Sequence, residues 1–303
     1  MSPRDGTGHP AAALLSVRVV YLLRLDPRLP WQPAAVEAAK RAVYEGFRAA
    51  TAGGAGAGQA GIIVDERSAS LLRDARAHGF TTACTIGAIG DAEFDSEEGN
   101  ELVVHASAGD ATYWRVIVRF NPGGCVLTPR QLVRLRRLSD ALLERPQPRL
   151  ICDLVVPPTQ WQLARGIRTF DRELLPDLTR TAITELLESG VTPDIWAIEG
   201  FERPLDYQRL LRTATGLHHH LACLVRAAGH SDKTTCELMT IGLSTTGVVG
   251  VVLGPAPFWE PVTSWMVGRS TRARAVAAVA EQFGSWVTRL ESSVRGVIQQ
   301  ERC

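Results

Sequence analysis

Short apolar runs alternate with longer amphipathic segments along most of the chain. Continuous runs of valine, isoleucine and leucine are typical of strands buried on both faces, whereas apolar residues spaced three and four positions apart predict helices. Eight strands are predicted, and most of them are followed by a predicted helix. The strands cover residues 16–25, 61–65, 81–86, 113–120, 150–159, 195–199, 221–225 and 247–253, and the helices cover residues 34–50, 68–78, 128–144, 174–189, 204–215, 231–240 and 272–290.

This alternation predicts an α/β fold in which parallel β/α units close into a single (β/α)8 barrel, the TIM barrel. We expect the barrel to span residues 17–295 and residues 1–16 to form a disordered leader. A doubly wound open sheet is the alternative. It is less favoured because no glycine-rich phosphate-binding turn follows the first predicted strand.

Ionisable residues lie near the C-terminal ends of several predicted strands, where barrels of this class keep their chemistry. Asp153 interrupts an otherwise apolar run, LICDLVVPPT, and a buried carboxylate of this kind needs a partner or a cavity. On the fourth strand, Arg115 and Arg119 share one face and are natural partners for it. The candidate catalytic residues are Asp153, Arg115 and Glu199, and the candidate substrate-binding residues are Asp65, Arg67, Arg119, Asn121 and Arg226.

Two interpretations of these charges remain open. In the first, Asp153 or Glu199 acts as a general acid/base while arginines hold an oxyanion or enolate. In the second, the charges form a closed layer of ion pairs that only fills the barrel. The roles of Asp65 and Arg67 have two interpretations as well, because these residues could bind substrate or form a salt bridge within their loop.

Composition excludes several classes of protein. The net charge of +1 gives no support for a nucleic-acid or membrane-surface role, and no apolar run reaches the roughly 20 residues that span a bilayer. The six cysteines are scattered, without a C-x-x-C pair or a signal peptide, which favours buried thiols in a reducing cytoplasm.

Several motifs occur in an order that resembles a known family. They are VDERSASLLRDA (64–75), VIVRFNP (116–122), QLVRLRRLSD (131–140), LVVPPT (154–159), VTPDIWAIEG (191–200) and FWEPV (258–262). Together they resemble the aldolase-like domain fused to the sugar kinase of bacterial inositol catabolism, which is similar to class I tagatose-bisphosphate aldolases. The resemblance implies a TIM barrel and carbon–carbon bond chemistry through an enamine.

The residues that carry this chemistry in the aldolases are largely replaced here. The position of the Schiff-base lysine holds Ala197, that of a second lysine holds Arg115, and the fifth-strand carboxylate is kept as Asp153. Arginine stays protonated in proteins and cannot form an imine. Other family positions are also changed: a charged pair after the third strand is replaced by about Gly87-Ala88, and two phosphate-binding glycine-arginine pairs appear as Ala227-Ala228 and Gly254-Pro255.

Any lysine chemistry must use one of two residues, because the chain contains only Lys40 and Lys233. We expect Lys40 to lie on a helix face that points away from the barrel mouth. Lys233 is expected at the start of a helix near the mouth, where a solvated surface lysine is the usual outcome.

A histidine run and two tryptophans are the other residues that could belong to a site. The run His218-His219-His220 precedes the seventh strand, at the end of a barrel associated with stability, so no metal site is expected there. Trp196 and Trp259 could line an apolar pocket or pack between the barrel and its helices.

The function expected from the sequence is that of a divergent aldolase-like lyase or isomerase of carbohydrate metabolism or biosynthesis, cytoplasmic and without a cofactor. It would catalyse an aldol-type, cyclisation, isomerisation or dehydration step on a small, non-phosphorylated carbonyl substrate. A homo-oligomer is compatible with the sequence. The alternatives are an inactive barrel that serves as a binding or partner subunit, and a class I aldolase that uses Lys233.

Overall fold

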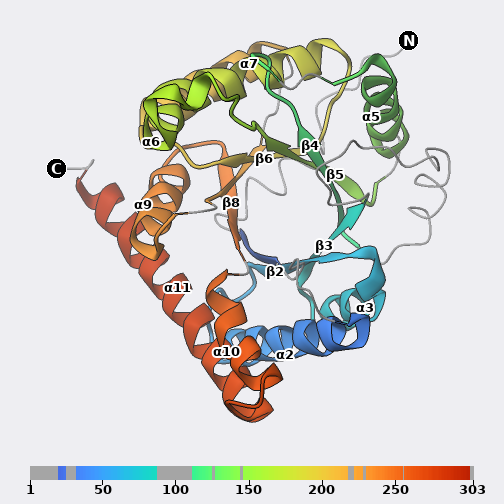
Figure 1. Ribbon diagram of the computed structural model, residues 1–303, viewed down its shortest axis with the longest axis vertical. Helices are drawn as coiled ribbons and strands as arrows, with labels where there is room; N and C mark the ends of the chain where they lie inside the picture. Colours follow the sequence, from blue (N-terminus) through green and yellow to red (C-terminus); the bar gives the residue numbers. More distant parts are fainter. Residues whose placement is uncertain are drawn as a thin grey trace.

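The fold is described by a computed structural model, shown in Figure 1. The structure describes residues 20–24, 32–86, 111–124, 127–143, 146–217, 222–227, 230–254 and 256–300.

Eight parallel strands form the centre of the molecule. They pair in sequence order from β1 to β8, and β1 also pairs with β8, so that the sheet closes into a barrel. Their bounds are β1 Val20–Arg24, β2 Ala60–Asp65, β3 Thr81–Ile86, β4 Tyr113–Arg119, β5 Arg149–Val155, β6 Ile195–Glu199, β7 Ala222–Arg226 and β8 Val248–Leu253.

Helices surround the strands, as Figure 1 shows, and α2, α10 and α11 lie side by side on one flank. The main helices are α2 Pro33–Ala52, α3 Ala69–Ala77, α5 Pro129–Leu143, α7 Leu175–Glu188, α8 Pro204–Leu217, α9 Asp232–Leu243, α10 Ala256–Met266 and α11 Arg272–Gln300. Shorter turns are η1 Glu66–Ser68, η2 Gln162–Arg165, α6 Ile167–Thr169 and η3 Phe170–Leu174.

Two hydrophobic clusters follow from the alternation of side chains along the strands. A large cluster lies between strands and helices and includes Trp196 and Ile198 of β6. A small cluster contains the opposite face of the strands, including Ile195 and Ala197. Much of the barrel interior is therefore apolar. The charged side chains of the candidate site lie beyond this apolar part, toward the C-terminal side of the strands.

The expected α/β class with a parallel sheet is confirmed. The predicted strands and helices agree with the structure to within a few residues, and β3 and β6 agree at both ends; the exception is α11, which was predicted to end at residue 290 and continues to Gln300. Residues 1–16 lie outside the described residues, as do residues 87–110 between β3 and β4.

Two helical regions were not predicted. Helix α10 contains Pro261, and the long connection after β5 folds into η2, α6 and η3. Local signals are weak in both regions, because proline opposes a helix interior and short turns lack a full period of apolar residues.

Candidate functional site

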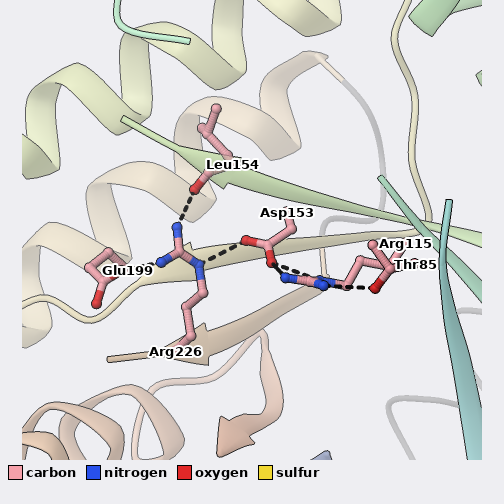
Figure 2. Close-up of polar contacts among 6 residues, drawn as sticks. All are labelled: Thr85, Arg115, Asp153, Leu154, Glu199 and Arg226. Carbon is pink, nitrogen blue, oxygen red and sulfur yellow. Dashed lines mark hydrogen bonds and ion pairs between the residues drawn. The ribbon is translucent and has the colours of Figure 1, made fainter. Parts of the chain in front are cut away.

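Four charged side chains, one from each of the strands β4 to β7, meet as Figure 2 shows. Arg115 donates from Nε to Oδ2 of Asp153 at 2.8 Å, and its Nη2 binds the same oxygen. Arg226 donates from Nε to Oδ1 of Asp153 at 2.8 Å, and its Nη1 pairs with Glu199 Oε2. Asp153 thus bridges two arginines, one from β4 and one from β7.

Two further contacts fix the orientation of these arginines. Arg115 Nη1 donates to Thr85 Oγ1 at 2.8 Å, and Arg226 Nη2 donates to the backbone carbonyl of Leu154 at 2.8 Å. Because Thr85 is in register with Arg115 across β3 and β4, both side chains point to the same face of the sheet. Glu199 is likewise in register with Arg226 across β6 and β7.

The electrostatics of Asp153 are set by its arginines. Burial raises the pKa of this carboxyl group, but the charges of Arg115 and Arg226 and the hydrogen bonds that they donate outweigh burial and lower it to about 2. Its side chain is only 1% exposed. Asp153 is therefore an ionised anchor with both oxygens engaged, which makes it a poor proton carrier near neutral pH.

Arg226 and Glu199 form the more open side of the cluster, with side chains 13% and 18% exposed. Burial lowers the pKa of Arg226, but the negative charges of Asp153 and Glu199 raise it above its ordinary value overall. Three of the five N–H groups of Arg226 are engaged by described residues, so two remain for a ligand oxygen.

Ala197 is the residue that the family resemblance aligns with the Schiff-base lysine. It is in register with Asp153 and belongs to the inner apolar cluster. The position therefore faces the barrel interior, beside the charged cluster, but it supplies only a methyl group.

The remaining candidate residues lie outside the cluster. Arg119 is exposed at the end of β4, and Arg67 is exposed in the turn after β2. Asn121 is buried, and its side-chain amide donates to Pro157 O at 2.7 Å and to Gln162 Oε1 at 2.8 Å while accepting from the Gly123 N–H. Its amide fastens the loop after β4 to the loop after β5.

Asp65 forms an ion pair, but not the pair with Arg67 that the sequence suggested. Its partner is Lys40, whose Nζ lies 2.6 Å from Asp65 Oδ2, and not Arg67. Lys40 was expected to point away from the barrel mouth, which is wrong, because its amine lies at the C-terminal end of β2. Lys233, in contrast, is 87% exposed beside Glu237 and does not point into the barrel.

Sequence reasoning missed Thr85, Lys40 and Ser68 as parts of polar networks. Thr85 had a usable signal, because it lies two residues after Ala83 on the inward face of β3. Lys40 had none: a helical pattern identifies an apolar face but does not say how far a long side chain reaches along it.

Among the described residues, no group of three or more histidine, cysteine or acidic side chains is placed to hold a metal ion. The run His218, His219 and His220 lies outside the described residues.

Within the part of the chain that the structure describes, no helix is long and apolar enough to cross a membrane. Trp196 and Trp259 are buried in the outer cluster, between barrel and helices.

Solved structures with the same fold include aldolases. An archaeal fructose-1,6-bisphosphate aldolase, with its catalytic lysine covalently bound to the carbinolamine intermediate, is 14% identical, with a TM-score of 0.53 over 91% of this chain and 100% of that one. The YdjI aldolase from Escherichia coli K12 is 10% identical, with a TM-score of 0.53 over 94% and 96%. The protein Cgl0159 from Corynebacterium glutamicum is 13% identical, with a TM-score of 0.53 over 94% and 88%.

These likenesses concern the fold alone. Neither a protein-family model nor a curated protein sequence matches the chain.

Proposed function

We propose that the chain is a (β/α)8 enzyme of the aldolase-like superfamily that stabilises an enolate without forming an imine. The observation that carries this proposal is the partly exposed Arg226, which keeps two N–H groups for a ligand and contacts a carboxylate that is itself partly exposed. An arginine held rigidly by Asp153 and Leu154 is a preorganised donor for a developing oxyanion.

In this mechanism Glu199 is the general base. Its carboxylate takes a proton from the carbon next to a substrate carbonyl, the electron pair of the C–H bond forms the C=C bond, and the carbonyl oxygen becomes the enolate oxygen that Arg226 holds. Asp153 keeps Arg226 and Arg115 in place, and Arg115 supports the same charge. The substrate is a small carbonyl compound without a phosphate group, since the glycine-arginine pairs of the resembling family are absent.

The test is the exchange of α-protons in D2O, followed by proton NMR. Dihydroxyacetone, hydroxyacetone and pyruvate serve as probes. We expect exchange with the wild-type protein and a loss of about 100-fold or more in E199Q and R226M, the range in which a single acid/base group or oxyanion donor contributes. E202Q is the matched control, because Glu202 is an exposed glutamate three residues further on and pairs with Arg172. Equal exchange in E199Q and E202Q contradicts the role of Glu199.

Borohydride reduction in the presence of dihydroxyacetone separates this mechanism from a Schiff-base aldolase. Lys40 is 3% exposed and pairs with Asp65, while Lys233 is solvated on α9. We therefore expect no reduced adduct on either lysine by peptide mass spectrometry. A stoichiometric adduct on Lys233 or Lys40 contradicts the enolate mechanism and restores an imine.

A second candidate function is a non-catalytic barrel that serves as a binding or partner subunit. The saturated hydrogen bonding of Asp153 favours it, because a closed layer of ion pairs also stabilises a barrel that does no chemistry. Absence of exchange with every probe, together with an intact fold, supports this alternative.

A further inference from the structure

A groove on the outer wall of the barrel is lined by arginines. It lies between α7 and α8, which pack against each other in the ring of helices around the strands (Figure 1). Its volume is about 590 Å³, and it is open to solvent. The residues that line this α7–α8 groove come from the two helices alone: Asp177, Arg180, Leu205, Arg209, Arg212 and Thr213. The groove is therefore separate from the charged site, whose residues lie on strands.

The spacing of residues on α8 makes one wall of the groove a continuous stripe. Leu205, Arg209 and Arg212 lie four and three positions apart, so they project from one face of the helix. Seven residues of α-helix rise about 10 Å. On α7, Asp177 and Arg180 are three positions apart and form the facing wall. A ligand that contacts both Leu205 and Arg212 must therefore be elongated.

Two carboxylates beside the groove hold their arginines loosely. Arg180 lies 3.4 Å from Asp177 Oδ1, and Arg209 lies 3.8 Å from Asp206 Oδ1. Strong charge-assisted hydrogen bonds measure about 2.7–2.9 Å. The Arg180 and Arg209 side chains are also 38% and 57% exposed, so water screens these pairs and weakens them. Both guanidinium groups therefore keep N–H groups that a ligand can engage.

The charge of the groove and an exposed leucine determine which ligand fits. The lining residues carry three positive charges and one negative charge. Arg212 donates to the carbonyl of Gln208, within its own helix, at 3.3 Å. Leu205, on the same face of α8, is 46% exposed. The arginines select an acidic ligand, and the leucine beside them selects one that also carries an apolar side chain.

The shape of the groove favours a peptide over a small molecule. Sites for small molecules are concave and bury most of the ligand surface. The α7–α8 groove is open and long, and it would leave much of a small ligand in water. Grooves between helices commonly bind segments of other proteins, and clusters of arginine recognise acidic ones.

We propose that the α7–α8 groove binds a short acidic segment of a partner protein. Carboxylates of the segment pair with Arg180, Arg209 and Arg212, and an apolar side chain of the segment covers Leu205. Asp177 is 68% exposed on the α7 wall and repels any carboxylate placed beside it. It thereby limits the positions in which an acidic segment can lie.

The test measures the binding of three synthetic peptides to the full chain by biolayer interferometry. The acidic probe EEDLEEFE is compared with QQNLQQFQ, which lacks its charges, and with EEDSEESE, which lacks its apolar side chains. We expect EEDLEEFE to bind most tightly. Its affinity should fall about 10-fold or more without the charges and several-fold without the apolar groups, and added salt should weaken it.

Charge reversal locates the binding on the molecule. R209E and R212E should each lower the affinity for EEDLEEFE about 10-fold or more, because a negative charge then faces an acidic ligand. R130E is the matched control: Arg130 is an exposed arginine on α5, and its reversal changes the net charge by the same amount. L205S should weaken the binding of EEDLEEFE and leave that of EEDSEESE unchanged. All four variants alter exposed side chains, and circular dichroism checks their fold.

A variant of the charged site separates this proposal from the enolate mechanism. E199Q should bind EEDLEEFE like the wild-type protein, since Glu199 lies on β6 and does not line the groove. R209E, in turn, should keep wild-type α-proton exchange. Either proposal can therefore fail while the other stands.

Three outcomes overturn the binding of a partner's acidic segment. The first is a lack of binding of EEDLEEFE, or an equal loss of affinity in R209E and R130E. The second is displacement of the probe by pyrophosphate at the same or a lower concentration, which indicates a site for small anions. The third is self-association in sedimentation velocity that R209E abolishes, which assigns the groove to a second copy of the chain.

Discussion

Asp153 shows how a single buried charge determines its surroundings. Its location inside an apolar run was sufficient to predict an arginine partner, because an unpaired carboxylate in a barrel interior is too costly to keep. The sequence predicted Arg115 and Arg119 for this role; the structure confirms Arg115, whereas Arg119 lies exposed at the end of β4. It did not reveal that Arg226, two strands further on, takes the second oxygen, because pairing across a closed sheet depends on curvature that local patterns do not encode.

The Asp153 network is expected to make stability depend on pH in a defined window. The pKa of Asp153 is lowered from 3.8 to about 2, so the folded state favours its ionised form. This contribution is complete above about pH 5 and is lost as the pH falls from about 4 to about 2; it amounts to about 2 kcal/mol. Chemical denaturation across pH 2–6 measures it.

D153N is expected to remove this dependence of stability on pH. It should also lower the free energy of unfolding at pH 7 by about 3 kcal/mol or more, because two buried arginines lose their shared counter-charge. D177N is the matched control, since Asp177 is an exposed aspartate beside Arg180. If D153N and D177N unfold alike at pH 7, the network contributes little to stability.

At the scale of elements, the packing of α2 against α11 depends on a glycine that has no signal of its own in the sequence. A Cβ atom at Gly46 would lie 2.6 Å from Val279 Cβ and 2.7 Å from the Val276 carbonyl oxygen. Periodicity predicted both helices, because each has a regular apolar face. It could not predict α10, whose Pro261 contradicts the local preference for a helix and is tolerated by tertiary contacts.

Two glycine substitutions in these helices should have opposite effects. G46A should lower the free energy of unfolding by about 1–3 kcal/mol through overpacking against α11. G284A, on α11, meets nothing within 4 Å and should raise it by up to about 1 kcal/mol, because alanine is the better helix former. Urea unfolding of both variants provides the comparison, and a stabilised G46A contradicts the close approach.

At the scale of the whole molecule, buried thiols report on the integrity of the barrel. Burial raises the pKa of Cys223 to about 12, and burial together with the charges of Glu66 and Asp65 raises that of Cys84 to about 12. The pKa of Cys152 is raised by burial and by Asp153. All three lie on strands of the barrel.

We expect these thiols to resist alkylation by iodoacetamide at pH 8 in the native protein, because they are neither exposed to the reagent nor ionised at that pH. Peptide mass spectrometry after timed labelling gives the rate at each position. Their labelling should become fast only in denaturant, at similar rates for all three. Rapid native labelling of Cys152 or Cys223 contradicts a packed barrel.

The pairing of β1 with β8 has a consequence for synthesis on the ribosome. Residues 20–24 leave the ribosome early, yet their second partner strand ends at residue 253. Until then the nascent sheet has two open edges that can pair with other chains. Strands β2 to β7 can assemble in order as they emerge, but closure waits for the last part of the chain. A nascent chain stalled before β8 is therefore expected to be a strong target for chaperones.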